Sequence, residues 1–187
     1  MKVKTIKGAS EKEIQKALSG NRIDGFQPTL AIVFMSIKQD IKAVCDLLNE
    51  KGVDVIGATS AGEFIEGHQS EGEIVILLMD MDKAHYSILF EHIGEKSLEE
   101  STKHLVEQAY QSFKKPAFIL LSTLIRSDGE FLNGESIVNY MEKIAGPDIT
   151  MFGGMAGDDI TFTGTWVFTN DKITDYGMAA LVLNEER

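Results

Sequence analysis

The feature that most constrains this chain is that it runs through the same order of elements twice. Within its 187 residues, an Ser-x-x-Glu segment, a proline-led apolar run, a helical pattern, a further strand and an Ala-Gly-acid loop occur first in about residues 1–82 and again in about residues 83–187. The proline and the loop glycine are 34 residues apart in the first half (Pro28 and Gly62) and 41 apart in the second (Pro116 and Gly157), which places an insertion at about residues 123–133. Several matches in one order indicate an internal duplication.

The repeated pattern predicts an α/β fold with duplicated β-α-β-α-β-β halves and mixed β-sheets flanked by helices. Ser-x-x-Glu segments beginning at Ser10 and Ser97 are typical of capping boxes, which start helices. Helical periodicity follows both, and again over about 38–50 and before Gly146. Short apolar segments predict strands near residues 3–6, 30–35, 53–58, 73–79, 86–90, 118–121, 149–152, 165–168 and 178–183. We expect one domain over residues 1–187, made of two similar halves.

Charge and cysteine content narrow the compartment and the partners. Eighteen Lys and Arg against 29 Asp and Glu give a net charge of −11, which disfavours nucleic acid and anionic membrane surfaces as partners. The N-terminus lacks the apolar region of a signal peptide, and no apolar run approaches the ~18 residues that span a bilayer. Cys45, the single cysteine, fits a reducing compartment and a buried position in its helix. These features predict a cytoplasmic protein.

The loop after the third strand of the first half is the first candidate ligand site. Thr59 and Ser60 offer hydroxyl groups, Gly62 lets a ligand approach the backbone, and Glu63 offers an anion. Such a set suits a zwitterion such as an amino acid, whose ammonium group the carboxylate can bind. Arg126, in the insertion of the second half, is a further candidate for binding a carboxylate. The structural alternatives are a plain turn with a surface glutamate and an exposed loop arginine.

The corresponding loop of the second half contains Gly153, Gly154, Gly157 and Asp158. Two adjacent glycines after a strand exceed what a simple turn needs, and Asp158 and its neighbour Asp159 can bind an ammonium group, hydroxyls or a cation. They can equally cap the local backbone. Because duplicated halves often pack about a pseudo-two-fold axis, we expect the two loops to approach each other. Ligands commonly bind between such halves and at the carboxyl ends of strands.

The sequence contains no complete catalytic motif. A nucleophile elbow needs glycine two residues before its serine, but Ala58 stands there before Ser60. The histidines show no metal-binding spacing; they are His68, His85, His92 and His104. No phosphate-binding glycine motif is present. We therefore expect no cofactor, no metal and no enzymatic activity. Two alternatives stay open, which are a hydrolase using Ser60 or the Glu63–Asp158 pair, and a non-catalytic interaction scaffold.

Several segments resemble a known family. These are the proline-led strand ending at residues 34–36 (FMS), the segment 54–63 (DVIGATSAGE), the segment 150–158 (TMFGGMAGD) and the closing strands at 165–170 and 177–183. In this order they resemble the FIST N-terminal domain, a sensory domain of prokaryotic and eukaryotic signalling proteins. Two positions depart from the family pattern, because Ala58 replaces a common cysteine and Met155 replaces a small residue.

The resemblance implies a signal-transduction sensory domain that binds a small ligand, with amino acids among the expected ligands. It also implies a partner, which is either a FIST C-terminal domain or a signalling output module. Because the chain stops at Arg187, just after the last predicted strand, we expect that C-terminal domain to be absent here. No catalytic residue is implied by the resemblance.

Overall fold

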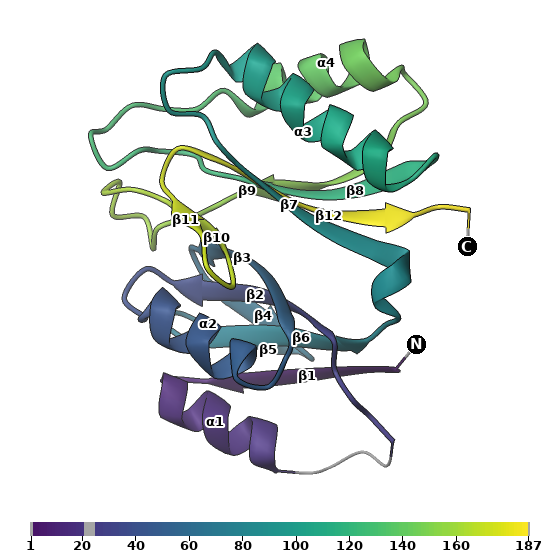
Figure 1. Cartoon of the computed structure of the whole chain (residues 1–187). Helices are drawn as coiled ribbons and strands as arrows, with labels where there is room; N and C mark the ends of the chain where they lie inside the picture. Colours follow the sequence, from purple (N-terminus) through teal and green to yellow (C-terminus); the bar gives the residue numbers. More distant parts are fainter. Residues whose placement is uncertain (1, 21–24, 187) are drawn as a thin grey trace.

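The structure, a computed structural model, describes residues 2–20 and 25–186 and consists of four layers, helix–sheet–sheet–helix (Figure 1). The first half contains β1 (Lys2–Gly8), α1 (Glu11–Ser19), β2 (Leu30–Ser36), α2 (Ile41–Asn49), β3 (Asp54–Ser60), β4 (Glu63–Ile65), β5 (His68–Ser70) and β6 (Ile74–Asp80). A 3-10 turn, η1 (Lys83–His85), leads into the second half. That half contains β7 (Tyr86–His92), α3 (Leu98–Ser112), β8 (Pro116–Ser122), α4 (Gly134–Ala145), β9 (Thr150–Met155), β10 (Val167–Thr169), β11 (Ile173–Thr174) and β12 (Gly177–Asn184).

The two halves have the same sheet topology. In both, the first strand pairs with the last, the last with the second and the second with the third, giving β1-β6-β2-β3 and β7-β12-β8-β9. The first two pairings are antiparallel and the third is parallel in each case. The parallel pairs are joined through α2 and α4, as parallel strands require a crossover. The α/β class with mixed sheets and flanking helices is confirmed, whereas common ancestry of the halves stays a prediction.

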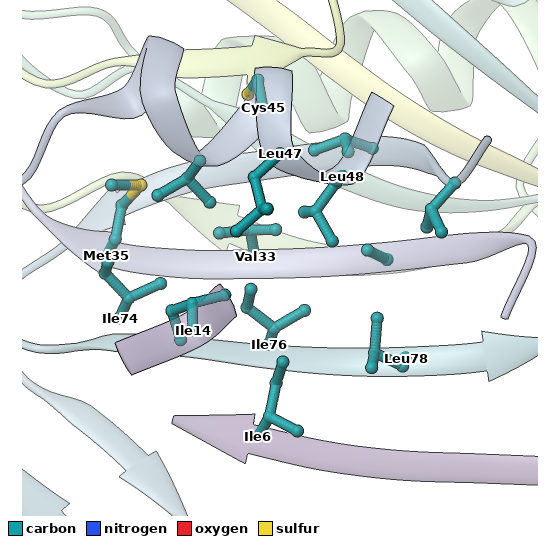
Figure 2. Packing of buried hydrophobic residues seen from close by; sticks show 14 of the residues in the cluster. Ile6, Ile14, Val33, Met35, Cys45, Leu47, Leu48, Ile74, Ile76 and Leu78 are labelled. Atoms are coloured by element: carbon teal, nitrogen blue, oxygen red, sulfur yellow. The ribbon is translucent and has the colours of Figure 1, made fainter. Parts of the chain in front are cut away.

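Three apolar cores hold the four layers together. One lies between α1, α2 and the six-stranded sheet, where Ile14 and Leu48 are fully buried against β2 and β6 (Figure 2). A second joins α3 and α4 to the four-stranded sheet. The third consists of residues from both sheets, such as Ile56 and Leu181, and fills the space between them. Because the sheets face each other across this core, strand ends from both halves come close together.

A hairpin from the second half completes the sheet of the first. β10 pairs antiparallel with β3, with Phe168 opposite Gly57, and β11 extends the sheet by one more strand. The ring of Phe168 occupies the space where a Cβ at Gly57 would lie, and Phe168 is fully buried. The six-stranded sheet is therefore built from both halves of the chain.

Several local predictions need correction. Residues 59 and 60 belong to β3 rather than to a loop, and Glu63 begins a short β4–β5 hairpin in which His68 is the first residue of β5. Ser97 and Glu100 form the predicted capping box at α3. At α1, Ser10 accepts from the amide of Glu13, but the Glu13 carboxylate accepts from Ala9 N instead of closing the box. In residues 2–20 and 25–186, no helix is long and apolar enough to cross a bilayer.

Candidate functional site

The first predicted loop is a tight turn that its own glutamate holds together. Gly62, at φ 120°, turns the chain between β3 and β4. Glu63 is 1% exposed; its Oε1 accepts from Ser60 Oγ at 2.8 Å and its Oε2 from Glu73 N at 3.1 Å. Both carboxylate oxygens thus bind within the protein. A ligand bound by Glu63 would have to replace one of these hydrogen bonds.

The second predicted loop meets the first directly. Gly157 N donates to Thr59 O at 2.9 Å, and a Cβ at Gly157 would lie 2.7 Å from Ala61 N. Thr59 is also bound to the residue that precedes β10, since its amide donates to Trp166 O at 2.9 Å. The predicted juxtaposition of the two strand-end loops is therefore present, and it depends on glycine at position 157.

The two aspartates after Gly157 bind different parts of the protein. Asp158, 6% exposed, accepts from Thr163 N at 2.7 Å and from Gly164 N at 3.3 Å, so that it caps its own loop. Asp159 Oδ2 instead accepts from Ser36 Oγ at 2.6 Å and forms an ion pair with Lys38 at 3.1 Å. The carboxyl ends of β2 and β3 and the segment after β9 thus form one strand-end cluster. We define this cluster as Ser36, Thr59, Ser60, Glu63, Gly157, Asp158 and Asp159.

Arg126 contacts groups other than the strand-end cluster. Its guanidinium forms ion pairs with Asp128 at 2.7 Å and with Glu130 at 2.8 Å, and it stacks 4.5 Å from the centre of the Tyr176 ring. The side chain therefore stabilises the insertion loop against the start of β12. Capture of a ligand carboxylate by Arg126 would compete with two existing acidic partners.

Gly153 and Gly154 lie in a different place, in a groove between α4 and the β8–β9 edge. The groove has a volume of about 560 Å³. It is lined by Leu120, Ser122, Gly134, Glu135, Ile137, Val138, Met151, Phe152, Gly153, Gly154 and Met155. α4 begins at this groove, where Asn133 caps its first turn, and the parallel strands β8 and β9 have their carboxyl ends there. The groove therefore occupies the position where open α/β sheets commonly bind ligands.

Sequence reasoning missed the α4 side of this groove. Glu135 and Val138 resemble ordinary exposed residues of a helix, and only the fold places them opposite the paired glycines. It also missed a second pocket, a polar one of about 320 Å³, at the join of the halves. There Lys83 forms an ion pair with Asp54 at 2.8 Å, and the Tyr86 hydroxyl donates a hydrogen bond to Asp54 at 2.8 Å. Burial, followed by the hydrogen bond to Asp54, raises the pKa of Tyr86, so this hydroxyl stays protonated.

The hydrogen bonds around Ser60 do not form a serine–histidine pair within the described residues. Ser60 Oγ contacts Glu63, whereas His68 Nε2 lies 3.3 Å from Glu73 Oε2. The described residues also contain no group of three or more His, Cys, Asp or Glu side chains arranged to bind a metal ion. The geometry offers a mostly apolar groove whose lining includes the carboxylate of Glu135, and a separate polar cluster at the strand ends.

Fold and site together define a two-sheet α/β domain whose halves meet at their strand ends. The FIST N domain model matches residues 29–187, so the chain belongs to the FIST N domain family. This is a family of sensory domains, and membership is consistent with a role in signal transduction. β1 and α1 lie outside the match but belong to the first core. No curated protein matches the chain.

Proposed function

We propose that this domain senses a small molecule bound in the groove between α4 and the β8–β9 edge. The observation that carries the proposal is the groove itself. Its volume of about 560 Å³ lies within the ~300–1,000 Å³ typical of small-molecule sites, and its position at the strand ends fits the α/β rule. Of the residues predicted from sequence, Gly153 and Gly154 line it, whereas no residue of the strand-end cluster does.

The lining indicates the chemistry of the ligand. Most of the groove is apolar, from Leu120, Ile137, Val138 and Met151, and Glu135 provides a carboxylate at the first turn of α4. An apolar surface with one anion suits a small molecule that has an apolar body and an ammonium group. An apolar amino acid has both, and it is the ligand we propose. Ligand binding would be signalled to a FIST C-terminal domain or to an output module.

The test is a thermal-shift and calorimetry screen of the chain against amino acids and their uncharged analogues. A ligand that binds only the folded state, at about 100 times its Kd, adds roughly 2.7 kcal/mol and raises the midpoint by a few degrees. Glu135→Gln should weaken binding of the ammonium ligands but not of uncharged analogues. Glu142→Gln, on the same helix and outside the groove, is the matched control. A screen without a hit, or equal effects of both substitutions, would overturn the proposal.

A further inference from the structure

The free edge of β9 differs from the other long edges of the two sheets. β1, at the edge of the six-stranded sheet, contains Lys2, Lys4 and Lys7, whereas the six residues of β9 (TMFGGM) contain no charge and no proline. Within residues 2–20 and 25–186, no strand pairs with the outer side of β9. Exposed strand edges usually contain charges or proline that prevent pairing with another chain. β9 lacks both.

The backbone of β9 is ready to accept another strand. The amide of Ala156 donates to Ser122 O at 2.7 Å, so it points to β8. Because strand residues alternate, the backbone groups of Met151, Gly153 and Met155 point to the open side. The equivalent edge in the first half, β3, is already covered by β10 in antiparallel pairing. The β3–β10 pair therefore shows, within the same molecule, that such an edge binds an antiparallel strand.

The side chains of β9 complement a second copy of the same strand. In an antiparallel pair centred on Gly153, Phe152 of each chain lies opposite Gly154 of the other. Phe152 is 69% exposed, and a Cβ at Gly154 would meet nothing within 4 Å. An aromatic ring opposite a glycine is the arrangement that Phe168 and Gly57 already show between β10 and β3. Aromatic residues across a strand pair compensate for the missing side chain of glycine.

We propose that β9 is a homodimerisation edge, where two copies of this chain pair antiparallel about Gly153. The pairing joins the four-stranded sheets of both copies into one continuous sheet and makes an isologous contact. A net charge of −11 opposes self-association in general, so an uncharged strand is the place where repulsion between copies is smallest. Phe152 is paired with Ile119, which packs into the core between the sheets, while Met151 packs on the helix side. The Phe152 side chain therefore leaves the sheet on the side of Ile119, although the residue also borders the groove.

Sedimentation velocity of the ligand-free chain between about 1 and 300 µM, a range that covers weak specific association, tests the proposal. We expect the mass to rise from monomer to dimer. Phe152→Lys places a charge on the edge and should weaken the dimer about tenfold or more. Phe64→Lys is the control, since Phe64 is 71% exposed on β4. The proposal is overturned if the chain stays monomeric over this range, which would leave the edge to a different partner. It is also overturned if the two variants behave equally.

Disulfide trapping tests the register. Residues 152 and 154 of opposite chains form a non-hydrogen-bonded pair, with Cα atoms about 4.5 Å apart, close enough for a disulfide. A mixture of Phe152→Cys and Gly154→Cys chains should therefore cross-link faster than either variant alone. Cys45 does not compete, because it is buried and burial raises the pKa of its thiol to about 12. Equal cross-linking in the mixture and in the separate variants would overturn this register. Neither experiment uses a ligand, so each outcome is independent of the proposed sensing function.

Discussion

At the residue scale, glycine controls the contact between the halves more than the acidic side chains do. Gly157 is in backbone contact with Thr59 and Ala61, while Glu63 and Asp158 are each bound to groups close in sequence. The sequence singled out four of these five positions, all but Ala61, because Gly-acid loops after strands can be recognised in the sequence itself. It could not show where their hydrogen bonds go, since these depend on which strand ends meet.

Gly157→Ala should destabilise the domain by about 1–3 kcal/mol, because the new Cβ would lie 2.7 Å from Ala61 N and the backbone must move. Gly154→Ala is the matched control. Its Cβ enters open space, so the change should stay within about 0.5 kcal/mol. Urea unfolding measured by circular dichroism gives both values. Equal stability of the two variants would mean that the contact between the loops is not close.

At the scale of elements, the long segments were predictable, whereas the β4–β5 hairpin and the pairing between the halves were not. The strand after Pro28, the strand after Pro116 and the helices with capping signals have enough periodicity to be recognised. The two strands of the β4–β5 hairpin have only three residues each, too short for a periodic pattern. β10 overlaps the strand predicted near residues 165–168, but the sequence did not predict its partner. The pairing of β10 with β3 is set by a partner more than 100 residues away, as the 107-residue separation of Thr59 and Trp166 shows. The groove was also not predicted, because its lining combines residues of α4 and β9 that only the fold brings together.

Phe168→Ala should cost about 3–5 kcal/mol, as expected for a fully buried phenylalanine, because it removes the ring that covers Gly57 and loosens β10 from β3. Phe64→Ala removes an equally large side chain that is 71% exposed and should change stability by no more than about 0.5 kcal/mol. Chemical unfolding of both variants measures the difference. Similar losses would indicate that β10 contributes little to the sheet.

At the scale of the whole molecule, the halves share a topology without being separable units. The four-stranded sheet contains strands of the second half alone, whereas the six-stranded sheet needs β10 and β11 from that half as well. The core between the sheets also contains residues of both halves. A repeat in the sequence therefore predicts the internal order of each half, but it does not predict that one half completes the other.

A fragment of residues 1–82 should not unfold cooperatively by itself, because it lacks the hairpin that covers β3 and the second face of the central core. Mixing it with the fragment 83–187 should restore a cooperative thermal transition. Calorimetry of each fragment and of the mixture measures this, with the intact chain as reference. A cooperative transition in the isolated first fragment, at the midpoint of the intact chain, would show that the halves fold independently.

The hairpin of β10 and β11 also has a consequence for synthesis on the ribosome. β3 emerges after its parallel partner β2, and β10, which pairs with its outer edge, follows 107 residues later, at the separation of Thr59 and Trp166. At about 5–20 residues per second, the nascent chain waits roughly 5–20 s with Gly57 and the edge of β3 uncovered. For that interval the outer edge of β3 is unpaired, as the outer edge of β9 is in the finished chain. Newly made chains on one messenger would thus be most exposed to wrong pairing before residue 174 is translated.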